Sequence, residues 1–276
     1  MTCRRASLSV RSAAANSRRV WAILGALLIS LSGCDTESSR VIEDTFEQLY
    51  TIEPSANITI QNGDGAVLVY GSNLNEMRVH AVKKAYSRTR LAQIAVNVST
   101  RPDSVSITTK FPPKPKWGLF DRSGTVDYTI VVPAAAGISE LNLDAGEILL
   151  DGMLGPTTRA RLGSGRIFAR NCFTKLEAVM ERGNLILSYD WWEEEQFSVH
   201  ARVAQGNVWA HLPGDAAFHL VAKAGHGQIF NDFKSAAVPE ESVDGMKLNA
   251  LLNNGGRATI KIRVAKGNIN ILETNP

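Results

Sequence analysis

The sequence predicts an all-β protein: a single-stranded β-solenoid with coils of about 20 residues and a capping region at its N-terminal end. A Gly followed at +2 and +4 by apolar residues recurs six times, with Asn231 as the one exception. Positions −3 and −5 before each of these glycines are also apolar. The glycines are 19, 18, 23, 21 and 40 residues apart, which is the spacing of short solenoid coils.

Each repeat is interpreted as strand, corner, strand and return. The glycines at the corners are Gly146, Gly165, Gly183, Gly206, Gly227 and Gly267. Alternation at a period of two marks a strand with one buried face. The step from −3 to +2 is odd, so the buried face would flip unless the chain turned a corner at the Gly, which tolerates positive φ. The spacing of 40 is close to two periods and predicts one repeat without its Gly.

Residues 1–33 have the layout of a signal peptide, with five arginines, no acid and a weakly polar or apolar stretch at 20–31. These 12 residues are fewer than the ~20 needed to span a bilayer as a helix. The sequence Leu31-Ser32-Gly33-Cys34 resembles the lipobox of bacterial lipoproteins. That resemblance implies cleavage between Gly33 and Cys34 and a diacylglycerol on the Cys34 thiol. The alternative is a secretory signal in which Cys34 is incidental.

Removal of this leader leaves 25 basic and 27 acidic residues, a net charge of −2. No Lys/Arg cluster interleaves with aromatic residues, so we expect no nucleic-acid partner. We expect an extracytoplasmic protein, held to a membrane by lipid on Cys34 through a polar linker at 34–44. Residues 17–21 resemble a twin-arginine signal, and Asp35 resembles an inner-membrane retention signal. Neither decides the export route, whether the membrane is the inner or the outer one, or whether the protein lies in the periplasm or at the cell surface.

Residues 45–140 are predicted to form an N-terminal β region that caps the stack and contains a first coil at Gly65. Strands are expected at 77–81 and 94–99, with a short helix at 85–93. Two further strands at 105–109 and 128–132 look like a hairpin. Their connection, 111–124, carries three prolines and cannot be a central strand. Residues 141–276 hold the solenoid repeats.

Four segments resemble a bacterial family known as "putative adhesin", a domain of unknown function related to the GIN-type adhesin heads. They are Asn62-Gly63-Asp64-Gly65-Ala66-Val67, residues 126–133, Leu212-Pro213 and Gly267-Asn268-Ile269-Asn270-Ile271. The likeness extends over about residues 43–273 and implies a β-solenoid of the cell envelope. It names no catalytic residue. The chain departs from the family at 225–228, where relatives more often have a Ser-Gly-Asp-like turn.

Two segments place large apolar side chains beside charged ones, as loops that bind sugars or proteins do. The candidate binding residues are Trp117, Leu119 and Phe120 in the proline-rich loop, and Trp191 and Trp192 before three glutamates. The alternative is that these aromatics pack over an end or an edge of the solenoid.

The residues beside the corner glycines are expected to form a solvent-facing polar stripe. They are Glu147, Ser164, Arg166, Arg182, Asn184, Gln205, Asn207, His226, Gln228, Lys266 and Asn268. A solenoid lyase or hydrolase would need acids and arginines gathered on one face. The residues available for this are Asp144, Glu147, Glu181, Arg161, Arg166 and Arg182.

No cofactor or metal is expected, because the glycines do not form a nucleotide-binding pattern and the five histidines lack ligand spacing. Cys172 is expected to be a small buried hydrophobe. The favoured function is a non-enzymatic, adhesin-like, scaffolding or partner-binding module that contacts an envelope glycan or protein. A carbohydrate-active enzyme and an envelope-stress accessory protein are the alternatives.

Overall fold

The computed structural model describes residues 41–113, 124–233 and 240–274, which belong to one compact unit. These residues fold as an all-β protein, so the predicted class is confirmed. Sixteen described strands join in one hydrogen-bonded sheet, and the described helix α2 (Arg88–Gln93) lies inside the predicted 85–93. In these ranges no helix is long and apolar enough to cross a membrane.

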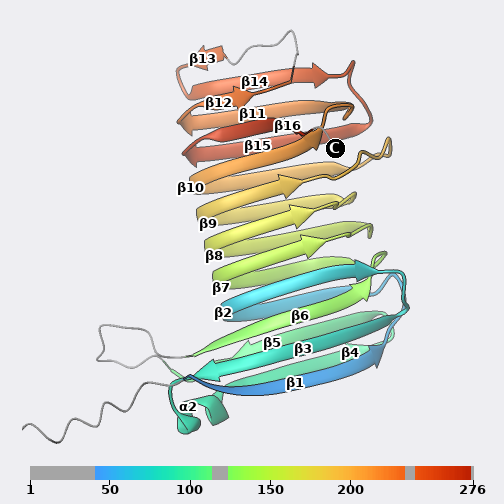
Figure 1. The fold of residues 1–276 in the computed structure, drawn as a ribbon, viewed down its shortest axis with the longest axis vertical. Coiled ribbons are helices and arrows are strands. Elements are labelled where there is room, and N and C mark those ends of the chain that lie inside the picture. Colours follow the sequence, from blue (N-terminus) through green and yellow to red (C-terminus); the bar gives the residue numbers. More distant parts are fainter. Residues whose placement is uncertain (1–40, 114–123, 234–239, 275–276) are drawn as a thin grey trace, which may run out of the picture. The chain divides into compact units, whose positions relative to one another are not determined.

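The strands stack along one axis in an order that differs from their order in the chain (Figure 1). The main path is β1-β3-β6-β2-β7-β8-β9-β10-β15-β11-β14-β13, with β5 pairing β2 and β4, and β16 pairing β10 and β12. The bounds are β1 (Ile42–Thr51), β2 (Asn57–Ser72), β3 (Glu76–Ala85), β4 (Ala95–Arg101), β5 (Ser104–Lys110), β6 (Thr125–Pro133), β7 (Gly137–Asp151), β8 (Thr157–Arg170), β9 (Lys175–Ser188), β10 (Ser198–Pro213), β11 (Phe218–His226), β12 (Ile229–Asn231), β13 (Glu240–Ser242), β14 (Gly245–Leu252), β15 (Ala258–Lys266) and β16 (Ile269–Thr274).

The long strands β2, β7, β8, β9 and β10 pair in parallel with their repeats in register. Gly65 pairs with Gly146, Gly146 with Gly165, and Gly165 with Gly183, so Gly65 aligns with the later corner glycines. Each of these glycines has φ between 123° and 133°. A Cβ on Gly165 would overlap the carbonyl oxygen of Gly146, which explains why the column is glycine.

The corner at each Gly lets both halves of a long strand face the same core. In β7 the buried residues are Leu141 and Leu143 before the corner, and Ile148 and Leu150 after it. Figure 1 shows the two halves of the long strands on opposite sides of the stack. The apolar columns merge into one continuous core cluster, as the period-two pattern predicts.

The predicted hairpin of 105–109 and 128–132 is wrong. β5 pairs in parallel with the first half of β2, from Asn57 opposite Ser104, and β6 pairs with its second half, from Val67 opposite Tyr128. The two strands therefore pair with the two halves of one long strand and do not pair with each other. Antiparallel pairings of β3 with β6, and of β1 with β3, follow at this end. β1 begins at Ile42, inside the predicted linker.

The prediction of a repeat without its Gly between Gly227 and Gly267 is also wrong. β14 fills that interval, but it runs antiparallel to β11 and carries no corner. The last repeat, β15 and β16, inserts between β10 on one side and β11 and β12 on the other. Gly267 accordingly stacks between Gly206 and Gly227. Apolar columns of the same period fit each other in any order, so the spacing alone does not give the stacking order.

Candidate functional site

Five of the predicted site residues lie outside the described residues: Gly33, Cys34, Trp117, Leu119 and Phe120. Lipidation at Cys34 and binding by the proline-rich loop therefore remain predictions.

The two predicted tryptophans have different surroundings in the turn between β9 and β10. Trp192 is partly buried against the core, with ring centroids 5.1 Å from Phe197 and 5.4 Å from Phe218. Trp191 is 49% exposed and lies 5.7 Å from Phe173. The geometry favours the packing alternative for Trp192 and leaves Trp191 accessible to a partner.

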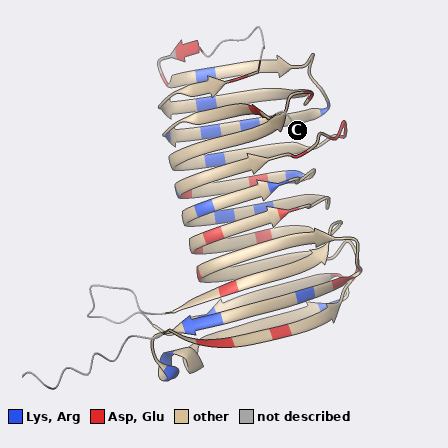
Figure 2. Ribbon diagram, viewed as in Figure 1, with Lys and Arg blue, Asp and Glu red and all other residues tan. Residues whose placement is uncertain are grey.

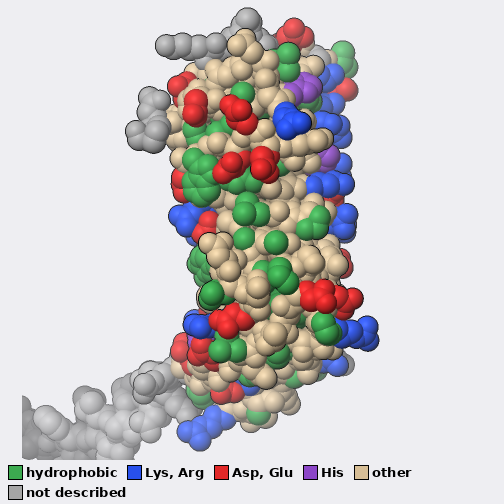
Figure 3. Space-filling model, turned by 90° about the vertical axis from the view of Figure 1, so that its right-hand side faces the viewer, with side chains coloured by type: hydrophobic (Ala, Val, Ile, Leu, Met, Phe, Trp, Pro, Cys, Tyr) green, Lys and Arg blue, Asp and Glu red, His purple; other side chains and the backbone are tan. Residues whose placement is uncertain are grey.

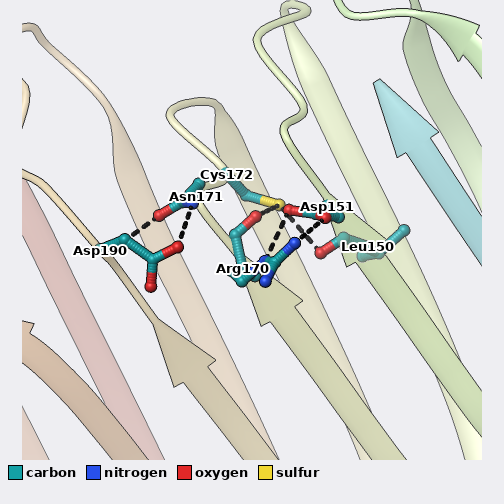
Figure 4. Close-up of polar contacts among 6 residues, drawn as sticks. All are labelled: Leu150, Asp151, Arg170, Asn171, Cys172 and Asp190. Carbon is teal, nitrogen blue, oxygen red and sulfur yellow. Dashed lines mark hydrogen bonds and ion pairs between the residues drawn. The ribbon is translucent and has the colours of Figure 1, made fainter. Parts of the chain in front are cut away.

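A polar staple joins the turns after β7, β8 and β9 (Figure 4). Arg170 donates to both carboxylate oxygens of Asp151, at 3.0 and 2.6 Å, and this pairing raises the pKa of Arg170. One turn further along the stack, the amide of Asn171 donates to the Asp190 carboxylate at 2.9 Å, and the backbone N–H of Asp190 donates back at 2.8 Å. These groups satisfy one another's hydrogen bonds and hold the ends of adjacent strands in register.

Cys172 lies beneath this staple, and its thiol donates to the carbonyl oxygens of Arg170 and Leu150, at 3.3 and 3.6 Å (Figure 4). The side chain is buried, and burial raises the pKa of the thiol to about 12. A neutral buried thiol is a poor nucleophile, so Cys172 acts as the small buried hydrophobe that the sequence predicts.

The acids and arginines proposed for an enzyme do not pair as a group. Among the described residues, the ion pair within this set is Arg166 to Glu147, 2.6 Å across β8 and β7. Both side chains are more than a third exposed, as in the pairs that keep a surface soluble. In the same ranges no group of His, Cys, Asp and Glu could hold a metal ion.

The polar stripe beside the glycines is accessible, since none of its predicted members is buried. Part of it has a structural role where the last repeat is inserted. The Asn207 side-chain oxygen accepts from the backbone N–H of Asn268, and the Asn268 side-chain oxygen accepts from that of Gln228, each at 2.9 Å. These amides join β10, β16 and β12 in their stacking order rather than in chain order.

A row of cations that sequence reasoning missed crosses β10, β15, β11 and β14 on the outer face. Arg202 lies directly opposite Arg263, Arg263 opposite Lys223, and Lys223 opposite Lys247. Figure 2 shows Lys and Arg in a column over these strands, and Figure 3 shows Lys, Arg and His along one border of the molecule. In the described part of the chain, Arg202 and Arg263 have no ion-pair partner, whereas both lysines lie within 4.0 Å of Asp244.

Beside this row the surface dips into a depression with a volume of about 930 Å³. The next outward positions, towards the glycine corner, are the small residues Ala204, Ala265 and Gly225, which form its floor. Beyond the floor, Lys266 and His226 form a second wall, and they lie opposite each other on β15 and β11. We call this depression the basic trough.

The ends of the basic trough are acidic. Glu181 on β9 lines one end and Asp244, before β14, lines the other. The positive walls therefore span the three strands β10, β15 and β11. Adjacent strands lie about 4.8 Å apart, so the distance from the first of these strands to the third is about 10 Å.

Sequence alternation could have marked Arg202, Lys223, Lys261 and Arg263 as outward-facing cations. Arg202, Lys223 and Arg263 each lie four residues before a corner Gly, so alignment of the repeats could also have placed them in one column. It could not have given their order, because β15 inserts between β10 and β11.

Comparison with known proteins gives structural likenesses only. No protein-family model matches the chain, and no curated protein matches it. A "putative cell adhesion protein" from Clostridium sporogenes is 15% identical, with a TM-score of 0.49 over 84% of this chain and 100% of that one. A "putative adhesin" from Bacteroides fragilis is 6% identical, with a TM-score of 0.28 over 83% and 97%. A "putative lipid binding protein" from Parabacteroides distasonis is 12% identical, with a TM-score of 0.29 over 83% and 97%.

Proposed function

We propose that this chain is a non-enzymatic, adhesin-like binding module of the bacterial cell envelope, tethered to a membrane by lipid on Cys34. Its repeats form a single-stranded β-solenoid with coils of about 20 residues. The protein acts outside the cytoplasm, where it presents the long faces of the stack to an envelope glycan or protein.

One observation carries the binding role: the in-register stacking of the repeats. Because Gly146, Gly165 and Gly183 align, residues at equal places in successive repeats form columns along the stack. Such columns give a rigid surface that a partner can follow over several coils. One such column contains the cations Arg202, Arg263 and Lys223.

The rigid core supports this role because it holds the outward side chains in place without a ligand. The space between the two halves of β7, β8 and β9 is filled by side chains such as Leu141, Ile148 and Leu185, each 0% exposed. Binding to a preformed surface avoids the entropic cost of ordering a flexible one.

The anchor is tested by fractionation of cells that express the full chain. We expect the wild-type protein in the membrane fraction, with radiolabelled palmitate incorporated. Cys34→Ser should abolish both, because it removes the thiol that the lipid needs. The matched control is Cys3→Ser, which changes a cysteine inside the predicted leader and should leave anchoring unchanged. A Cys34→Ser protein that still carries palmitate would refute the anchor.

The binding role is tested separately with the purified soluble part, residues 35–276, and isolated envelope preparations. We expect saturable retention of the wild-type protein on whole envelopes. An absence of saturable retention on envelopes, including those of neighbouring species, would refute the binding role whatever the state of Cys34.

A further inference from the structure

We propose that the basic trough binds a short anionic glycan segment, whose acidic groups pair with Arg202 and Arg263 on one wall and Lys266 on the other. This inference rests on the proposed binding role and names the chemical class of its ligand. The unliganded protein has one unfavourable feature that an anion would relieve.

That feature is the direct opposition of like charges. Arg202 and Arg263 are cross-strand neighbours without an ion-pair partner among the described residues, whereas Lys223, opposite Arg263, pairs with Asp244 at 3.3 Å. Like charges in these positions repel and destabilise a sheet. On β7 and β8, by contrast, the opposed charges Glu147 and Arg166 attract each other. An anion that lies between the cations of the trough would remove the repulsion.

The shape of the trough indicates a chain-like ligand rather than a flat surface. Its floor is made by Ala204, Ala265 and Gly225, so a ligand can sink between the two cationic walls. A bilayer presents a plane of headgroups, which would meet the ends of the long side chains but leave this floor uncovered. The apolar floor suits the C–H face of a sugar ring, while the guanidinium groups suit its carboxylates, because Arg binds carboxylate in a bidentate manner.

The ends of the trough limit the ligand to a short anionic stretch. Glu181 and Asp244 would repel negative charge that continued along the stack, so the favourable region covers about 10 Å. A nucleic acid carries charge without such a break. Single-stranded nucleic acids also stack their bases on aromatic side chains, and none of the described residues that line the trough is Phe, Tyr or Trp.

Calorimetric titration of residues 35–276 with a short oligogalacturonate tests the inference. We expect saturable binding that weakens as NaCl rises from about 0.05 to 0.2 M, because the contacts are ionic. Arg202→Ser and Arg263→Ser should each weaken binding about tenfold, which corresponds to about 1.4 kcal/mol. Oligogalacturonate should raise the melting temperature of the wild-type protein by mass action, and less so that of Arg263→Ser.

Two matched variants separate local contacts from net charge. Arg161→Ser removes the same charge from the same face on β8, with Val179 between it and Arg202. It should change affinity less than twofold. Ala265→Gln fills the floor without a change of charge and should weaken binding at least tenfold. Equal effects of Arg161→Ser and Arg263→Ser would overturn the site.

The competing ligands are included as probes. A neutral maltooligosaccharide, single-stranded DNA and vesicles with anionic phospholipids should each bind more weakly than oligogalacturonate. Tighter binding of any of them would overturn the anionic-glycan assignment. If the Arg202→Ser/Arg263→Ser double variant retains wild-type binding to whole envelopes, this inference fails and the proposed binding role stands.

Discussion

At the corner glycines, the absence of a side chain permits both the positive φ and the close approach of the neighbouring strand. Gly183 has φ of 128°, and a Cβ on it would overlap the carbonyl oxygen of Gly165 on the neighbouring strand. Both the dihedral angle and the close approach exclude other residues at this position. Gly152, in the turn after β7, differs: its φ is 66°, and the nearest atom to an added Cβ is 3.8 Å away. Asparagine tolerates that left-handed region.

We therefore expect Gly183→Ala to lower the free energy of unfolding by at least about 2 kcal/mol, from strain and steric overlap. Urea unfolding followed by circular dichroism measures this change. Gly152→Asn is the control and should unfold within about 0.5 kcal/mol of the wild-type protein. Equal losses in the two variants would contradict the steric account.

His200 lies near Arg202 of the basic trough, among the positive charges of Lys261, Arg202 and Lys175. Burial and Lys261 lower its pKa from 6.5, with a smaller lowering from Arg202 and Lys175, while Glu177 acts in the opposite direction. The folded protein therefore binds fewer protons than the unfolded chain at mildly acidic pH. The contribution of His200 to stability is fully present above its pKa in the unfolded chain. It is lost as the pH falls through its pKa in the folded protein.

We expect the melting temperature to decline as pH falls below about 6.5, with a shallower decline in His200→Gln. Differential scanning calorimetry between about pH 5 and 7.5 measures the slope. Lys261→Gln should also reduce the slope, because it removes the leading electrostatic cause. An unchanged slope in both variants would show that His200 does not contribute.

At the scale of the element, a long strand depends on the burial of both of its halves. In β9, Leu176, Ala178 and Met180 are buried before the corner, and Leu185 and Leu187 after it. Neither half makes a stable sheet alone, since each needs the parallel strands on both sides and the opposite wall.

Leu185→Asp should accordingly cost about 3–5 kcal/mol, because it buries a charge without a partner in the middle of the stack. A loss of cooperative unfolding in urea is the expected observation. Leu154→Asp introduces the same charge in the turn after β7, where Leu154 is 56% exposed, and should leave the unfolding midpoint nearly unchanged. A wild-type midpoint for Leu185→Asp would be incompatible with a shared core.

At the scale of the whole molecule, the C-terminal repeat lies inside the stack and connects its two parts. β15 pairs with β10 on one side and β11 on the other, so the last repeat joins the series of long strands to β11 and β14. Without it, β11 and β14 would keep only the three-residue strand β13 as a further partner, and a ribbon this small is marginally stable in water.

Truncation after Asn253 removes β15 and β16 and tests this topology. We expect hydrogen exchange to show fast exchange throughout β11, although β11 precedes the deleted segment by more than one strand. The full-length chain should keep β11 protected. If the repeats stacked in chain order, β11 would instead remain protected against β10 in the truncated protein.

The sequence by itself determined the all-β class, the glycine corners and the core columns. These depend on local alternation and on the conformational freedom of Gly165 and its equivalents, both of which are written in each repeat. It also indicated that the residues beside the glycines are accessible and that Cys172 is buried.

Only the tertiary structure decided the stacking order. The apolar residues of β5 and β6 alternate with a period of two, as they would in a hairpin. The last repeat has the same apolar columns as the others. Local patterns therefore do not distinguish these pairings. The arrangement of the basic trough depends on that order, because Arg263 lies between Arg202 and Lys223 when β15 inserts between β10 and β11. Long-range pairing, which is selected by the whole chain, therefore sets the order of the cations in the candidate site.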